Sequence, residues 1–126
     1  MKKIIETTNA PAPIGPYSQA VKFDDTLYTS GQIAINPESG NLILENINLE
    51  TKQVMNNLGA VLKEAGMNFE HVLKATIYIK NMDDFQEINK VYGSYFNESN
   101  APARETVQVA RLPRDVNVEI SLLARK

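Results

Sequence analysis

Two charged residues near the end of the chain are the strongest candidates for chemistry. Arg104 follows a proline and an alanine at the start of a predicted strand, and Glu119 lies in a later predicted strand within residues 116–120. A guanidinium group can bind a carboxylate through paired hydrogen bonds, and a carboxylate can orient a water molecule or transfer a proton through it. Together they suit the hydrolysis of a small anionic substrate, which neither residue indicates alone.

The alternation on either side of residues 112–115 predicts a hairpin with these residues as its loop. Its expected core side comprises Val107, Val109, Val116, Val118, Ile120 and Leu122. Its other side comprises Arg104, Thr106, Gln108, Asn117, Glu119 and Ser121, and is too varied for a plain solvated face, so we expect another surface to cover it.

In this register Arg104 lies opposite Leu123, roughly 13 Å from Glu119 along the strand at about 3.3 Å per residue. Two arrangements remain open. Either a bound substrate and a water molecule lie between Arg104 and Glu119, or the partner of each comes from a neighbouring copy of the chain.

Three further positions could contribute to such a site. Tyr17 follows a proline-rich loop, residues 9–16, that could present a phenol, although the pattern also fits an aromatic ring packed beneath the loop. Gly31, after Ser30, either lets a substrate approach the backbone or relieves crowding at a strand end. Asn89 lies within a predicted helix, where its amide either faces solvent or fixes a loop or a substrate.

Several familiar catalytic motifs are absent from the sequence. His71 is the only histidine and has no neighbours at metal-ligand spacing, and no Walker motif, nucleotide-binding glycine motif or Ser-His-Asp set is present. The lack of cysteine excludes disulfides, thiolate nucleophiles and cysteine-based metal sites. The sequence therefore predicts no metal site.

The elements that would position these residues follow from the periodicity of the apolar residues. The first half of the chain predicts a strand at residues 4–5, a hairpin of residues 20–23 and 27–33, and a helix over about residues 49–65. A strand at residues 73–79, a second helix capped by Asp83 or Asp84, and the final hairpin follow. This order predicts an α+β fold, in which one mixed sheet has both helices packed on its apolar side.

The composition limits the class of protein. The chain has 126 residues, which fit a single domain over residues 1–126. Its 13 Lys and Arg against 15 Asp and Glu leave no basic excess of the kind that binds nucleic acid. The first apolar run ends at Glu6, far too short for a signal peptide, and no run approaches a membrane span. We therefore expect a cytoplasmic protein that binds neither membrane nor nucleic acid.

Five short motifs, in order along the chain, resemble those of the Rid (YjgF-type) family of enamine/imine deaminases. They are Gly15-Pro16-Tyr17-Ser18, Thr29-Ser30-Gly31-Gln32, Asn89-Lys90-Val91-Tyr92, Pro102-Ala103-Arg104 and Val109-Ala110-Arg111-Leu112-Pro113. The resemblance covers the whole length of the chain. It implies a chorismate-mutase-like α+β fold, assembled as a homotrimer with substrate clefts between subunits.

The resemblance also implies an activity, which is hydrolysis of 2-iminobutanoate and 2-iminopropanoate to 2-oxo acids and ammonia, with no cofactor or metal. Arg104 matches the arginine that binds the substrate carboxylate, and Glu119 matches the acid that positions or activates the attacking water. The positions matching the lining of the cleft are Tyr17, Ser30, Gly31, Asn89 and Thr106. Of these, we expect Tyr17 to have a catalytic role as well.

One departure from the family pattern leaves the substrate range open. Glu105-Thr106 stands where Ser or Thr followed by Cys is common, and strand alternation predicts that Thr106 faces the pocket while Glu105 faces away. Two other functions remain as alternatives. They are a non-catalytic, regulatory trimer that binds 2-oxo acids, and the endoribonuclease or translation inhibitor with which the family has also been associated.

Overall fold

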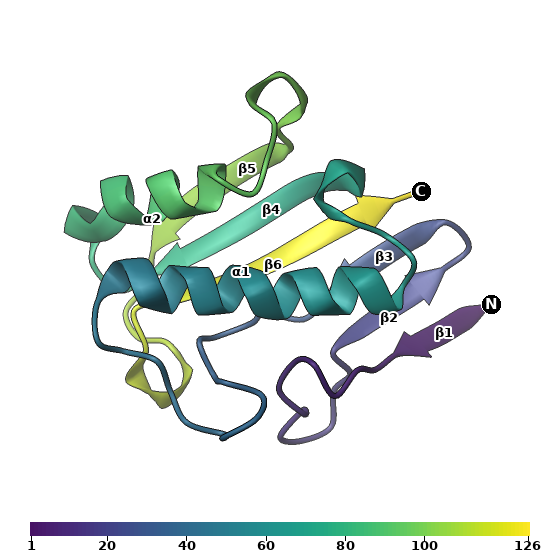
Figure 1. Cartoon of the computed structure of the whole chain (residues 1–126), viewed down its shortest axis with the longest axis horizontal. Helices are drawn as coiled ribbons and strands as arrows, with labels where there is room; N and C mark the ends of the chain where they lie inside the picture. The colour runs from purple at the N-terminus through teal and green to yellow at the C-terminus, as the bar shows by residue number, and fades with distance from the viewer.

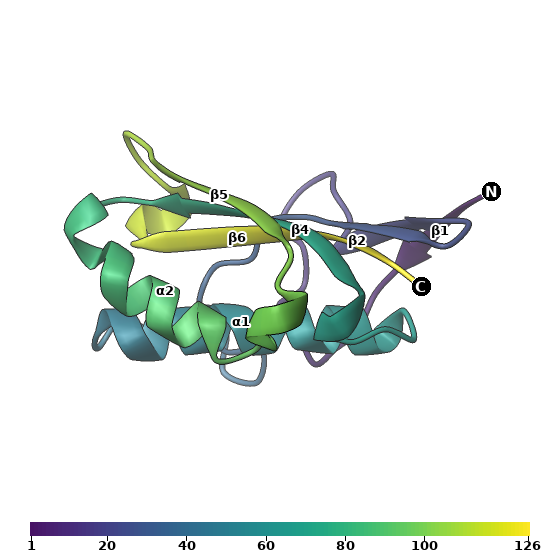
Figure 2. The same ribbon diagram turned by 90° about the horizontal axis from the view of Figure 1, so that it is seen from above.

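The computed structural model describes all residues 1–126. One six-stranded sheet has the strand order β1-β2-β3-β6-β4-β5, in which only the β4–β5 pair is parallel. The strands are β1 (Lys2–Ile5), β2 (Ala20–Phe23), β3 (Thr26–Thr29), β4 (Val72–Ile79), β5 (Ala103–Gln108) and β6 (Val118–Arg125). The helices α1 (Ile47–Glu64) and α2 (Phe85–Gly93) lie on the same face of the sheet (Figures 1 and 2). The predicted α+β class with one mixed sheet is confirmed.

The sequence contains a capping residue before helix α1 and a glycine that ends it. The Asn46 side chain accepts a hydrogen bond from the N–H of Leu49 at 2.8 Å, and Gly66 ends the helix with a φ of 75°. Asp84 occupies the corresponding position before α2 but makes no capping hydrogen bond. The Asn81 side chain instead accepts from Asp83 N–H, so Asp84 has the predicted N-cap position but not the capping role. Neither helix is long and apolar enough to cross a membrane.

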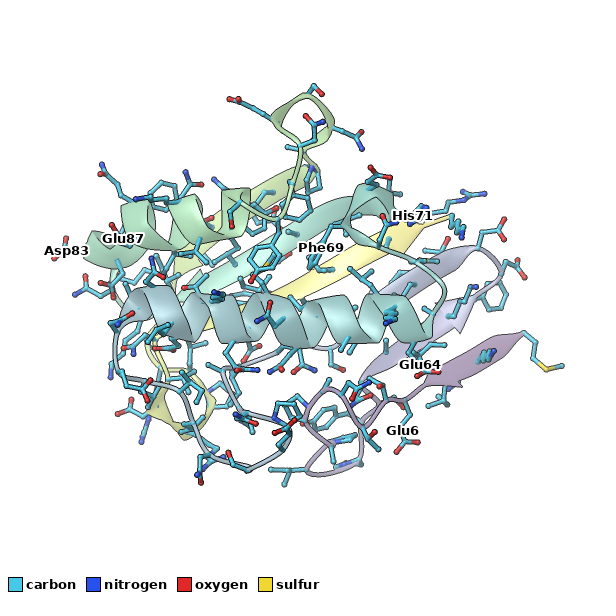
Figure 3. The ribbon with its side chains drawn as sticks, viewed as in Figure 1. Glu6, Glu64, Phe69, His71, Asp83 and Glu87 are labelled. Atoms are coloured by element: carbon cyan, nitrogen blue, oxygen red, sulfur yellow. The ribbon has the colours of Figure 1, made fainter.

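The core lies between the helices and the central strands. Ile77 and Ile79 of β4, with Val118 and Ile120 of β6, point toward the helices and are fully or almost fully buried. Phe69 packs against α1 and the segment after α2, with its ring 5.3 Å from Tyr95 and 5.4 Å from Phe96 between centroids (Figure 3).

The opposite face of the sheet is covered by no helix (Figure 2). Alternation places Ile4, Tyr28 and Val107 on this open face, where they are 49%, 51% and 41% exposed. Ile4 and Tyr28 lie in one row across β1, β2 and β3, and neighbouring exposed apolar side chains are typical of a surface that another molecule covers.

The predicted final hairpin is wrong, because β4 separates β5 from β6. Arg104 pairs with Ala75 in parallel β4, whereas Leu123 pairs with Lys74 on the other side of that strand. The long strand β4 takes a partner on each side, which the alternation within β5 and β6 alone could not reveal.

This pairing separates the residues that the sequence placed on one polar face. Arg104 and Thr106 are level with Ala75 and Ile77, whose side chains are buried beneath the helices. Glu119 pairs with Tyr78, the residue after Ile77, whose side chain points to the opposite face of β4. Glu119 therefore faces the open side of the sheet. Arg104 and Glu119 lie on opposite faces of the sheet.

Candidate active site

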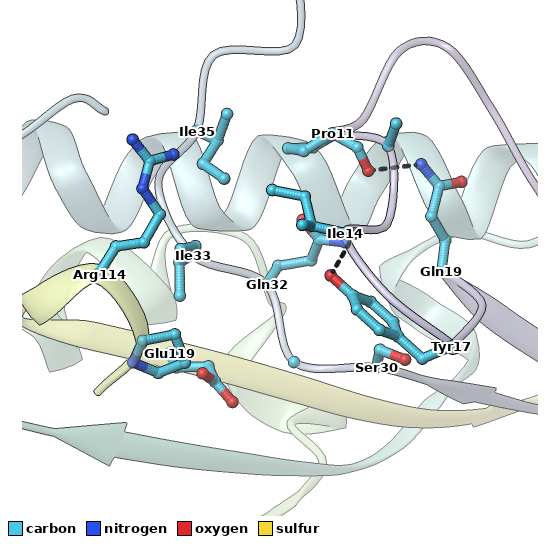
Figure 4. Close-up of a pocket in the computed structure, with 13 residues that line it drawn as sticks. Pro11, Ile14, Tyr17, Gln19, Ser30, Gln32, Ile33, Ile35, Arg114 and Glu119 are labelled. Carbon is cyan, nitrogen blue, oxygen red and sulfur yellow. Dashed lines mark hydrogen bonds between the residues drawn. The ribbon is translucent and has the colours of Figure 1, made fainter. Parts of the chain in front are cut away.

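A cavity of about 660 Å³ is bounded by the proline-rich loop, the segment after β3 and the loop before β6 (Figure 4). Of the predicted site residues it brings together Tyr17, Ser30, Gly31 and Glu119. These residues come from separated parts of the sequence, and the sheet pairing between Gln32 and Ile120 brings two of those parts side by side.

The proline-rich wall of this cavity is held in place by Gln19, which the sequence did not single out. Gln19 is 2% exposed, and its amide accepts from Thr7 N–H at 2.7 Å and donates to Pro11 O at 2.8 Å. The Tyr17 hydroxyl accepts from Ile14 N–H at 3.2 Å (Figure 4). Tyr17 is half exposed in the cavity wall and is not a plug beneath the loop, so that interpretation is wrong.

Ser30 is fixed by two hydrogen bonds to the backbone of the two residues before β2. Its hydroxyl donates to Ser18 O at 2.6 Å, and its N–H donates to Gln19 O at 2.9 Å. The side chain is therefore oriented by the fold before any substrate binds.

Gly31 has a specific steric reason to be glycine. A methyl group at this position would collide with the carboxylate of Glu119, whose Oε2 atom is the nearest neighbour of the missing Cβ. Of the two roles expected for Gly31, this contact matches relief of crowding at a strand end, although the sequence did not identify Glu119 as the neighbour. The absent side chain makes room for the acid.

Glu119 itself is half-buried and has no hydrogen-bond donor or cation paired with it within the chain. Burial raises the pKa of its carboxyl above the ordinary value. A carboxylate with a raised pKa, open to a cavity and free of partners, is suited to accept a proton from water or to return one.

Arg104 lies at a second cavity of about 680 Å³, next to α2 and the start of β5. Its Nη1 donates to Asn89 Oδ1 at 2.5 Å, and its guanidinium lies over the rings of Phe85 and Tyr92 at 5.7 and 5.2 Å. Asn89 therefore faces Arg104, which favours the interpretation that its amide has a positioning role. The guanidinium is held in one orientation while part of it stays open to the cavity.

Two hydroxyl groups near Arg104 are buried without a hydrogen-bond partner, those of Tyr92 and Thr106. Burial raises the pKa of Tyr92 to about 12, and the positive charge of Arg104 opposes this shift. The Tyr92 hydroxyl is therefore neutral at physiological pH. Thr106 shares the Arg104 face of β5, as predicted, but does not line either of these cavities.

The predicted site residues thus form two groups that one chain does not join. The cavity with Glu119 and the cavity with Arg104 share no lining residue. No group of three or more His, Cys, Asp or Glu side chains is arranged to hold a metal ion. One cavity contains the carboxylate of Glu119 and the other the guanidinium of Arg104.

Comparison with known proteins places the chain in a family. A family model described as endoribonuclease L-PSP matches residues 7–126. A RutC family protein of Synechocystis sp. is 52% identical over 97% of this chain and 95% of its own length. A mouse protein named 2-iminobutanoate/2-iminopropanoate deaminase is 48% identical over 98% of this chain and 91% of its own length.

A solved structure gives the same result. The crystal structure of a protein of the conserved Rid family from Yersinia pestis has a TM-score of 0.97 and 45% identity, covering 100% of both chains. The motifs, the fold and the relatives agree, and the chain belongs to the endoribonuclease L-PSP family, the Rid family that its sequence resembles.

Proposed function

We propose that the protein is a hydrolase acting on C=N bonds, which converts 2-iminobutanoate and 2-iminopropanoate to 2-oxo acids and ammonia. The proposal depends mainly on one observation. The carboxylate of Glu119 is half-buried, has a raised pKa and no partner within the chain, and faces a cavity. The printed name of the mouse relative supports the choice of substrates.

The complete site, in this proposal, lies between neighbouring copies of the chain in a homotrimer. Within one copy, Arg104 and Glu119 lie at separate cavities on opposite faces of the sheet. A second copy can present its Arg104 to the Glu119 of the first. The open sheet face, with Ile4, Tyr28 and Val107 exposed, offers the apolar area that a stable contact between copies needs.

The reaction then needs few protein groups. Arg104 binds the substrate carboxylate through its guanidinium, and the iminium carbon is already electrophilic. Ionised Glu119 accepts a proton from the attacking water, whose oxygen bonds to the imine carbon. Glu119 returns this proton to the nitrogen, the C–N bond breaks, and the hydroxyl proton leaves with ammonia, which gives the 2-oxo acid.

The assay couples a threonine dehydratase, which generates 2-iminobutanoate, to detection of 2-oxobutanoate. Arg104→Ala is expected to lower kcat/KM by about 10²-fold, by analogy with loss of one preorganised charge-stabilising group. Arg125→Ala, an exposed arginine at the end of β6, is the matched control and should retain activity. Equal rates for wild type and Arg104→Ala would remove Arg104 from the mechanism. Binding of 2-oxobutanoate without faster imine hydrolysis would point to a sensing role instead.

RNA cleavage, which the family description suggests, is less compatible with this chain. The net charge is −2 and no stretch of Lys and Arg is present, whereas binding to RNA depends on contacts between basic residues and phosphates. RNA cleavage that persists through purification and is lost in Arg104→Ala would show that the protein is a ribonuclease.

A further inference from the structure

Arg114 has an unusual backbone conformation for its residue type. Its φ and ψ are 54° and 21°, in the left-handed region, and Asp115 follows with a φ of 57°. For residues other than glycine this conformation costs roughly 1–2 kcal/mol each. Strain of this kind persists where the surroundings impose it, and it clusters at functional sites.

The surroundings of this turn hold it firmly. Asp115 N–H donates to Leu112 O at 3.0 Å, and the Asp115 carboxylate pairs with Lys80 at 3.2 Å. Immediately after the turn, the buried carboxylate of Glu50 accepts the N–H of Asn117 at 2.8 Å. These contacts fix the direction in which the Arg114 side chain leaves the backbone.

That direction is into the cavity that contains Glu119. In Figure 4 the Arg114 side chain extends past Ile33 toward Ile35, away from the Glu119 carboxylate. The ion pairs of this loop are made by Lys80 and Arg111 with Asp115, and Arg114 takes part in neither. Arg104, in contrast, already donates to Asn89. Arg114 lines this cavity, and its guanidinium has no hydrogen-bond or ion-pair partner within the chain.

Within a single copy of the chain, the cavity is also larger than the proposed substrate requires. A volume of about 660 Å³ is in the range that holds drug-sized ligands, whereas 2-iminobutanoate has only four carbon atoms. Ile33 and Ile35, both half-buried, form an apolar wall between the region of Glu119 and the guanidinium of Arg114 (Figure 4). An apolar wall that ends at a cation fits a short methylene chain that ends in an anion.

We propose that Arg114 is a specificity-determining residue, which binds a second carboxylate at the far end of the substrate and admits dicarboxylic 2-imino acids to the site. The inference rests on the proposed imine hydrolysis and extends its substrate class. The methylene groups of such a substrate lie along Ile33 and Ile35, and its distal carboxylate accepts hydrogen bonds from the Arg114 guanidinium.

The test compares two imines in wild type, Arg114→Gln and the matched control Arg111→Gln. 2-Iminoglutarate is generated by an L-glutamate oxidase and 2-iminobutanoate by a threonine dehydratase. Arg114→Gln is expected to lower the ratio of kcat/KM for 2-iminoglutarate over 2-iminobutanoate by about tenfold, the value of a hydrogen bond between charged groups. Arg111→Gln removes a charge from the same loop outside the cavity and should preserve the ratio.

A binding measurement separates failure of this inference from failure of the proposed function. Calorimetric titration with 2-oxoglutarate and 2-oxobutanoate should show tighter 2-oxoglutarate binding that depends on Arg114. If 2-iminobutanoate is hydrolysed but the ratio and the binding do not respond to Arg114→Gln, the role of Arg114 is wrong and the deaminase stands. If no imine is hydrolysed, the deaminase is wrong, and the titration alone decides whether Arg114 binds a second carboxylate.

Discussion

Gly31 and Glu119 behave as one unit, because the carboxylate occupies the space that any other residue at position 31 would need for its Cβ. Gly31→Ala should therefore displace the Glu119 side chain while leaving the fold intact, since the displaced atoms are the flexible end of that side chain. We expect kcat/KM for 2-iminobutanoate to fall by about 10²-fold, the lower end of the effect of losing a general acid or base.

The double variant distinguishes this explanation from a general disturbance. If Gly31→Ala acts through Glu119, adding it to Glu119→Gln should cause little further loss, because the two changes remove the same interaction. Independent, multiplicative losses, or a melting curve showing that Gly31→Ala is unfolded, would contradict the explanation.

The raised pKa of Glu119 predicts the pH dependence of the reaction. In the proposed mechanism Glu119 is ionised when it accepts a proton from water, so kcat/KM should fall as the pH drops through a pKa above the ordinary carboxyl value. Glu119→Gln should be slow and should lack this limb of the pH–rate profile. A limb that persists unchanged in Glu119→Gln would assign the ionisation to another group.

Protein stability should respond to the same ionisation in a defined direction. Because burial raises the pKa of Glu119 in the folded state, its contribution to stability is fully present below the unfolded pKa and is lost as the pH rises through the folded pKa. Glu119→Gln should therefore be more stable than wild type at neutral pH, with the difference shrinking toward acidic pH. Urea unfolding at several pH values measures this, and a constant difference would show that burial does not perturb the acid.

At the level of secondary structure, local patterns were predictable and the pairing of distant strands was not. The hairpin around Asp24 and Asp25, the strand at β4 and both helices follow from periodicity and turn residues, within a few positions of the observed ends. Alternation within β5 and β6 is compatible with several partners, and β4 inserts between them. The sequence predicted a distance between Arg104 and Glu119 along the strand, but the face that Arg104 occupies depends on that pairing, so their position on opposite faces was not accessible from the sequence.

Contacts made by buried polar residues were also missed, because they join positions far apart in the chain. Glu50, in the first turn of α1, is fully buried, and its carboxylate accepts hydrogen bonds from the N–H groups of Asn117 and Val118 and from the Asn117 amide. In the sequence it is indistinguishable from an exposed acid in the first turn of a helix. In the structure it ties α1 to the start of the strand that carries Glu119.

Removing this connection should destabilise the fold more than an ordinary surface substitution. Glu50→Ala leaves buried N–H groups without acceptors, and we expect the free energy of unfolding to fall by about 3 kcal/mol. Glu64→Ala, at the exposed last turn of the same helix, is the matched control and should change it by less than about 0.5 kcal/mol (Figure 3). Urea denaturation measures both. Similar midpoints for the two variants would show that Glu50 is not required to hold the strand.

For the whole molecule, the separation of Arg104 from Glu119 has a consequence that can be tested by mixing inactive proteins. If each site of the proposed homotrimer takes Arg104 from one copy and Glu119 from another, trimers that contain both Arg104→Ala and Glu119→Gln subunits have one intact site. Random mixing of equal amounts should then restore about one quarter of wild-type activity. Co-refolding, or co-expression with two different tags followed by tandem purification, yields the mixed species for the imine assay. Activity that stays at the level of the separate variants would mean that both residues act within one chain.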